Sequence, residues 1–199
     1  MVADTDLERS RVRAARAGDR PAMEELIRAH SDSAFRFALT ILRNQSDAED
    51  ATQSAFVKAF TNMNRFDPSR RFEPWLLSIV YHEALNLRRA DRTRWAFWQR
   101  QPKRPGAIES TESAALVRAE HQELWQALNR LKDDDRTILV LSYLLGYGEA
   151  ETAEVLSIKR GTVKSRKHNA LQRLRALVER EYPGLRPDDL AASTEGEPR

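Results

Sequence analysis

Residues 147–166 read YGEAETAEVLSIKRGTVKSR, and this stretch decides the fold expected for the C-terminal half of the chain. A short helical segment with the small Ala153 near its centre is followed by a tight turn. A second helical segment, whose first residues are polar and positively charged, comes after the turn. This arrangement is typical of a helix-turn-helix, in which Ala153 lets the helices cross closely while Ile158 and Val163 fill the angle between them. The first turns of the second helix carry the side chains expected to meet bases and phosphates, namely Lys164, Ser165 and Arg166.

Charge is unevenly distributed around this motif, although the whole chain has a net charge of only +3. Residues 159–180 contain eight Lys or Arg residues and one acid, a net charge of +7, whereas residues 132–158 have a net charge of −4. A helix with that much positive charge favours a polyanionic partner, and beside a helix-turn-helix that partner is DNA. The alternative is an ordinary solvated helix face.

The composition favours a charge-rich helical protein, with 41% hydrophobic and 32% charged residues and only 7 Gly and 8 Pro among 199 residues. The absence of Cys excludes disulfides and thiolate metal sites. The N-terminus lacks the apolar run of a signal peptide, and no stretch approaches the roughly 20 apolar residues of a membrane span. We therefore expect a cytoplasmic protein that does not insert into membranes.

No group of residues has the spacing that catalysis or metal binding requires. The four His residues are scattered, and none has a Cys or a pair of carboxylates at ligand spacing. The sequence contains neither a Gly-rich phosphate loop nor a Ser/His/Asp arrangement. We expect a protein that is not an enzyme and binds no metal and no cofactor, with His30 and His121 at core or boundary positions.

Helical periodicity runs through almost the whole chain and predicts an all-α fold. Residues 20–43 form one expected helix, with Pro21 suited to its first turn. Ser46 and Glu49 have the spacing of a capping box, which would open the next helix at about residues 47–63.

Turn and linker signals divide the helices into two small domains. A turn at residues 67–68 precedes a long helix expected from about Glu73 to Arg94. Further along, Asp133 to Asp135 and Gly146 mark the start and end of another helix. The expected organisation is a first domain at 1–94, a flexible basic linker at 95–112, a second domain at 113–180 and a disordered acidic tail at 181–199.

The segment between the second and third of these helices reads NRFDPSRRF at residues 64–72. Such a loop suits the capture of unstacked bases from single-stranded DNA, because aromatic rings stack on bases and Arg side chains attract the backbone. Phe72 and the nearby Trp75 have an alternative assignment as core residues, which is the favoured one for Trp75.

Three motifs, in this order, carry a resemblance to a known family. The first is Asp47-Ala48-Glu49-Asp50 with Gln53 and Phe56, the second runs from Phe66 to Ile79 and continues with Asn86 and Arg88-Arg89, and the third runs from Glu151 to Arg166. Together they resemble the extracytoplasmic-function (ECF) group of bacterial RNA polymerase sigma factors, of the sigma-70 family, over about residues 20–178. The resemblance implies a sigma region 2 bundle, a sigma region 4 helix-turn-helix domain, and a function in promoter-specific transcription initiation.

The resemblance also implies roles for residues that match its motifs. Those implied in binding core polymerase are Asp47, Glu49, Asp50 and Gln53. Those implied in melting and capturing the −10 element are Asn64, Arg65, Phe66, Asp67, Ser69, Arg70, Arg71, Asn86, Arg88 and Arg89. Those implied in reading the −35 element are Thr162, Lys164, Ser165, Arg166, His168, Asn169 and Arg173. Of these, Lys164 and Ser165 are the expected base contacts, and Arg166 and Arg173 the expected phosphate contacts.

The partners that the resemblance implies are core RNA polymerase, through its β and β′ subunits, promoter DNA, and an anti-sigma factor. Several residues depart from the family pattern and leave the promoter sequence open: His82, Thr152, Lys167, His168 and Asn169. Two other functions remain as alternatives. One is a free-standing helix-turn-helix transcriptional regulator, and the other is an interaction module whose basic helix binds an acidic protein.

Overall fold

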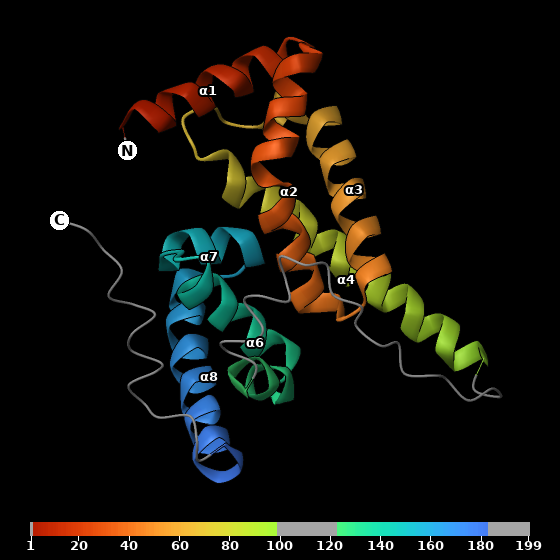
Figure 1. The fold of residues 1–199 in the computed structure, drawn as a ribbon, viewed down its shortest axis with the longest axis vertical. Coiled ribbons are helices and arrows are strands. Elements are labelled where there is room, and N and C mark those ends of the chain that lie inside the picture. The colour runs from red at the N-terminus through yellow and green to blue at the C-terminus, as the bar shows by residue number, and fades with distance from the viewer. Residues whose placement is uncertain (1, 99–122, 183–199) are drawn as a thin grey trace. The chain divides into compact units, whose positions relative to one another are not determined.

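The computed structural model describes residues 2–98 and 123–182, and every regular element within them is helical. The predicted all-α fold is confirmed for these residues. The chain divides into two compact units. The first contains α1, α2, α3, η1 and α4, and the second contains a helix at residues 123–130, α6, η2, most of α7, and α8 (Figure 1).

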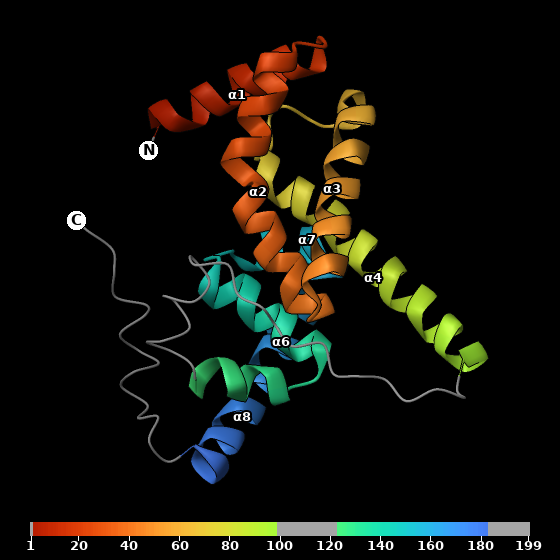
Figure 2. The same cartoon turned by 45° about the vertical axis from the view of Figure 1, so that its right-hand side comes forward.

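The first unit is a bundle of three helices with a fourth packed against it. Helices α2 (Arg20–Leu42), α3 (Gln45–Thr61) and α4 (Phe72–Trp98) all contact one another, and α1 (Val2–Arg16) lies against α2 (Figure 2). A one-turn 3-10 helix, η1 (Met63–Arg65), follows α3. The core combines large side chains with small ones that allow close helix packing: Leu26, Phe37, Ala48, Ala51, Ala55, Leu76, Leu77 and Val80 are buried.

Local signals set the start of α2 as the sequence predicted. Pro21 lies in the first turn, and the Asp19 carboxylate accepts a hydrogen bond from the Ala22 N–H at 3.3 Å. The helix ends at Arg43, whose φ of 56° is left-handed and whose N–H reaches the Leu39 carbonyl at 2.9 Å.

The capping box predicted for α3 is wrong. The helix begins two residues earlier than that box would place it, because Asn44 has extended backbone angles and accepts the Asp47 N–H at 2.9 Å. Ser46 is therefore already helical, and the Glu49 carboxylate accepts a hydrogen bond from the Gln45 side-chain amide at 3.0 Å instead.

The second unit places α8 (Arg160–Glu181) against α6 (Asp133–Leu139). A π-helical turn, η2 (Val140–Leu144), continues α6, and Gly146 ends the run with a φ of 67°, as its sequence position predicted. Helix α7 (Glu149–Leu156) precedes α8. Buried side chains along α8 recur at helical spacing and form its core stripe: Val163, Ala170, Leu174 and Val178.

Beyond the start of α3, two further features differ from the sequence-based expectation. Helix α1 was not predicted, and α4 continues to Trp98, into the segment expected to be a linker. Three predictions lie outside the described residues. They concern the remainder of that linker, the core or boundary position expected for His121, and the tail from residue 183. None of the helices described by the structure has the length and apolar character needed to cross a membrane.

Candidate nucleic-acid interface

The predicted helix-turn-helix is present. Helix α7 ends at Leu156, and α8 begins at Arg160 after a turn in which Ser157 has a φ of 53°. The Ile158 N–H closes this turn by reaching the Ala153 carbonyl at 3.0 Å. Val163 is fully buried, as expected, whereas Ala153 and Ile158 are only half-buried.

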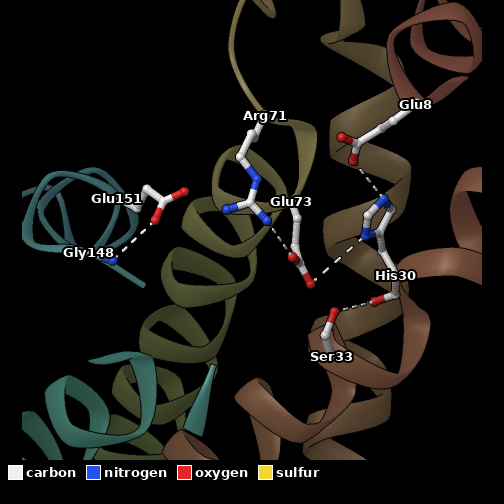
Figure 3. A network of polar contacts seen from close by, with 7 residues as sticks. All are labelled: Glu8, His30, Ser33, Arg71, Glu73, Gly148 and Glu151. Atoms are coloured by element: carbon white, nitrogen blue, oxygen red, sulfur yellow. Dashed lines mark hydrogen bonds and ion pairs between the residues drawn. The ribbon is translucent and has the colours of Figure 1, made fainter. Parts of the chain in front are cut away.

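Hydrogen bonds at the start of α7 fix where the motif begins. The Glu151 carboxylate accepts the Gly148 N–H at 3.1 Å (Figure 3). The Gly148 carbonyl accepts the Thr152 N–H at 2.9 Å. Thr152, which departs from the family pattern, is completely buried. A threonine therefore fits the buried position at which the family pattern has a different residue.

Helix α8 has an exposed polar face of the kind that enters a DNA groove. Six side chains define this recognition face, and five of them were predicted from the sequence: Lys164, Ser165, Arg166, His168, Asn169 and Gln172 are all exposed. Gln172 was missed, although it follows Asn169 by three residues and Ser165 by seven, which places the three on one side of a helix. Thr162, another predicted contact, is half-buried, and its carbonyl accepts the Ser165 hydroxyl at 3.1 Å.

The cations of α8 differ in whether they already form an ion pair within the protein. Glu149 of α7 lies 3.6 Å from Arg160 and 4.0 Å from Lys167. Lys164 and Arg166, in contrast, take part in no ion pair or hydrogen bond within the described parts of the chain. A cation without an internal partner keeps its full attraction for an external anion, and Lys164 and Arg166 are such cations near the start of α8.

Arg173 has a structural role that the sequence did not indicate. Its Nη1 donates to both carboxylate oxygens of Asp135, at 2.7 and 2.9 Å, and so ties α8 to α6. Asp135 is buried, and Arg173 is the cation that compensates its charge on that side. The predicted phosphate contact of Arg173 remains a prediction, and it would have to share this guanidinium with Asp135.

We expect Arg173→Ala to lower the free energy of unfolding of the second unit by about 1–2 kcal/mol, because the substitution leaves the Asp135 carboxylate buried without this partner. Urea denaturation followed by amide exchange of α6 and α8 peptides measures the change. Arg175→Ala, at another exposed cation of the same helix, is the matched control. Unchanged stability combined with weaker DNA binding would mean that Arg173 acts on DNA alone.

The second candidate surface is the α3–α4 loop, defined as residues 62–71. Six of its predicted DNA-binding side chains are exposed, namely Asn64, Arg65, Asp67, Ser69, Arg70 and Arg71. The Asp67 carboxylate accepts both the Ser69 N–H at 2.9 Å and the Ser69 hydroxyl at 2.8 Å. These two hydrogen bonds, with the nearby Arg70 charge, lower the pKa of Asp67 and give the loop a defined turn.

An aromatic cluster supports this loop from the core side. The Phe66 ring lies 4.8 Å from that of Trp75 and 5.8 Å edge-on from that of Phe72, measured between centroids. Phe66 and Phe72 are buried, while Trp75 is half-buried. Of the two assignments left open for Phe72, the structure shows the core position, whereas Trp75, for which the core was favoured, lies at the edge of the core. Phe66 was predicted to contact DNA, but in this structure its ring is packed within the cluster.

Beyond the loop, α4 carries the remaining residues predicted to bind the −10 element. Asn86 and Arg89 are exposed and Arg88 is half-buried. They lie two turns or more past the aromatic cluster on the same helix.

A third surface lies on α3. Glu49, Asp50 and Gln53 are exposed and Asp47 is half-buried, while Phe56 is buried as expected. Val57, which was not predicted from the sequence, is 65% exposed and follows Gln53 by one helical turn. Single exposed apolar side chains are common on protein surfaces, so the exposure of Val57 does not by itself mark a binding surface. The surface formed by Asp50, Gln53 and Val57 is called the α3 face below.

His30 occupies the boundary position that the sequence predicted. Its Nε2 lies 3.3 Å from the Glu8 carboxylate, and its Nδ1 lies 4.0 Å from that of Glu73, which in turn lies 3.7 Å from Arg71 (Figure 3). Burial disfavours the charged imidazole, but the Glu73 and Glu8 carboxylates outweigh this effect and raise the pKa of His30 to about 9. Among the residues that the structure describes, no group of three or more His, Asp or Glu side chains could hold a metal ion.

Comparison with known protein families gives the same two-part organisation. The family model for sigma-70 region 2 matches residues 26–94, and the model for sigma-70 region 4 matches residues 121–174. The first match covers the bundle and the loop, and the second covers the helix-turn-helix.

Similar whole proteins are ECF RNA polymerase sigma factors. The chain is 34% identical to SigE of Mycolicibacterium smegmatis over 157 residues, which cover 78% of the chain and 61% of SigE. It is 33% identical to SigM of Mycobacterium tuberculosis over 163 residues, which cover 81% of the chain and 80% of SigM.

Among solved structures, the sigma factor RpoE of Bartonella quintana, in complex with the anti-sigma factor NepR, has the same fold. The TM-score is 0.66 at 23% identity, covering 79% of this chain and 97% of RpoE. CnrH, in complex with the cytosolic domain of CnrY, matches with a TM-score of 0.65, also at 23% identity, over 87% and 98% of the two chains. The level of identity to SigM over most of both proteins, together with the two region matches, places this chain in the extracytoplasmic-function group of RNA polymerase sigma factors.

Proposed function

We propose that this sigma factor brings core RNA polymerase to promoters through three surfaces, each with its own binding function. In this proposal the recognition face of α8 reads the −35 element, the α3–α4 loop captures the melted −10 strand, and the α3 face docks on the polymerase. The observation that carries the proposal is the recognition face, where exposed Lys164 and Arg166 have no internal partner although neighbouring cations of the same helix do.

The recognition face has the chemistry for reading bases in a major groove. Lys164 and Arg166 suit guanine or phosphate contacts, and the Asn169 amide suits adenine. Ser165 and His168 complete the set, since both are exposed on the same turns of α8. The first turn of α8 contains no acidic residue of its own, although Glu149 of α7 lies 3.6 Å from Arg160.

Replacing Lys164 with alanine is expected to weaken use of the −35 element by about 1–3 kcal/mol if the amine reads a base. The loss should then concentrate on one position of the −35 element. Affinity for a panel of single-base −35 variants measures this, with Lys159→Ala as a matched control because Lys159 precedes the first turn of α8. An equal loss for every variant, with a smaller salt dependence, would show that Lys164 only contacts a phosphate.

The α3–α4 loop supports the −10 assignment through shape and charge. The Asp67–Ser69 turn holds the backbone in place, and Asn64, Arg65 and Arg70 are exposed around it. Because the Phe66 ring is buried, we assign Phe66 the task of anchoring the loop, and we assign capture of the flipped base to the exposed polar groups.

The α3 face is assigned the docking role because Asp50 and Gln53, which match the family's core-binding motif, are both exposed on α3. Asp50→Ala together with Gln53→Ala is expected to reduce affinity for core polymerase at least tenfold, while helicity by circular dichroism stays the same, since both side chains are exposed. Binding of core polymerase to the labelled chain measures the effect. An unaltered affinity in the double variant would rule out this face.

An anti-sigma factor is a further partner in this proposal. The support is that RpoE and CnrH, which share this fold, were each solved in complex with another protein, named for RpoE as the anti-sigma factor NepR. Such a partner would have to cover at least one of the three surfaces to keep the chain from its promoter.

A further inference from the structure

We propose that helix α1 is a brace for the α3–α4 loop, with Arg16 and Glu8 as its positioning residues. The proposal rests on the proposed function, because it concerns the loop to which capture of the −10 strand is assigned. It deepens that function by naming what holds the loop in a shape that accepts DNA.

The first support of the loop is direct. Helix α1 contacts η1, the 3-10 turn with which the loop begins. Arg16, at the end of α1, donates a hydrogen bond from Nη2 to the backbone carbonyl of Asn64 at 3.2 Å. Because this hydrogen bond goes to the backbone, it fixes the path of the chain at Asn64 whatever side chain that position carries. Figures 1 and 2 show the loop passing beside α1.

The second support acts at the other end of the loop through His30. Glu8 of α1 contacts His30 of α2, and His30 contacts Glu73 in the first turn of α4 (Figure 3). Arg71, the last residue of the loop, also lies against Glu73. One helix is thus connected to both ends of the loop, directly at Asn64 and by way of His30 and Glu73 at Arg71.

The packing of α1 gives it the rigidity that a brace requires. Val12 and Ala15 are buried where α1 packs against the bundle. Arg11 also forms a 2.6 Å ion pair with Glu25 of α2, but this pair is exposed to solvent and adds little to that packing. Arg16 lies one turn beyond Val12 and acts on Asn64.

In this arrangement the contact that positions the loop is distinct from the contacts that hold the bundle together. Arg16 is exposed, so its loss should not unfold the bundle, whereas the loop would lose one of its two supports. A looser loop should bind each flipped base less well and should discriminate less between bases at the captured position, because both depend on a pre-formed pocket.

The test uses the full chain with core polymerase and a set of promoters that differ by single bases in the −10 element. Reactivity of unpaired thymines toward permanganate reports the open complex. Arg16→Ala is expected to lower the equilibrium constant for opening about three- to tenfold and to flatten the differences among −10 variants. Arg16→Lys should recover part of the loss, and Glu8→Ala should share it. Arg11→Ala, on the same helix but directed to Glu25, should leave both readouts unchanged.

Two results would overturn the brace. One is a loss in Arg16→Ala no larger than in Arg11→Ala. The other is an equal loss for all −10 variants together with a smaller dependence on salt, which would make Arg16 a phosphate contact. Asp67→Ala, which removes the turn at Ser69, separates this failure from failure of the proposed function. If Asp67→Ala also leaves promoter opening unchanged, the loop does not capture the −10 strand, and the brace falls with it.

Discussion

Replacing Phe72 with alanine is expected to lower the free energy of unfolding of the first unit by about 3–5 kcal/mol. Phe72 is only 1% exposed and is the first residue of α4, where its ring contacts those of His30, Phe66 and Trp75. Alanine would leave a cavity at the point where the loop joins the bundle. Opening of the −10 element should therefore decline along with stability, since the loop loses its anchor.

Urea denaturation of the full chain, followed by amide exchange of α2 and α4 peptides, measures the loss in the first unit. Peptides from α8 serve as an internal reference, because α8 belongs to the second unit. Phe72→Leu, which keeps most of the buried volume, should cost less than half as much. A loss below about 1 kcal/mol in Phe72→Ala would contradict the core assignment of this ring.

The first unit is also expected to lose about 2–3 kcal/mol of stability as the pH rises from 6.5 to about 9. In the folded state Glu8 and Glu73, the latter beside Arg71, raise the pKa of His30 to about 9, above its ordinary value of 6.5. Below pH 6.5 both folded and unfolded chains bind the proton, and the stabilisation is complete. Between 6.5 and 9 only the folded chain keeps the proton, so stability falls as the pH rises.

Urea denaturation at these two pH values, compared with His30→Gln, isolates this contribution. Glutamine does not titrate, so the variant should lack the part of the pH dependence that comes from residue 30. An NMR titration of the His30 imidazole in the folded chain gives the pKa directly. A value at or below 6.5 would contradict the network of carboxylates around this side chain.

Features encoded by neighbouring residues were predictable from the sequence. Pro21 and Gly146 mark a start and an end that depend on local backbone geometry, and both predictions are confirmed. The cap of α3 was not predictable in the same way. Asn44 and Ser46 are both good capping residues two positions apart, and the choice depends on which of them has an extended backbone.

Features that depend on the tertiary structure could not be predicted from the sequence. Helix α1 offers few large apolar residues, and its stability comes from Val12 and Ala15 packing against the bundle, so its periodicity gave little signal. The pairing of Arg173 joins residues 38 positions apart. The exposed residues of α8 and the loop were largely predictable, because helical spacing and composition place them. The sequence did not predict whether a given cation already forms an ion pair, or whether a given ring such as that of Phe66 is buried.

The most direct test of the central claim is run-off transcription from a genomic fragment library, using purified core polymerase with and without this chain. The account predicts discrete new transcripts that require the chain and share −35 and −10 elements upstream of their start sites. These transcripts should be reduced by Lys164→Ala and by the Asp50→Ala, Gln53→Ala double variant. Sequence-specific DNA binding by the chain alone, with no transcripts that depend on polymerase and the chain together, would contradict the account and indicate a free-standing regulator.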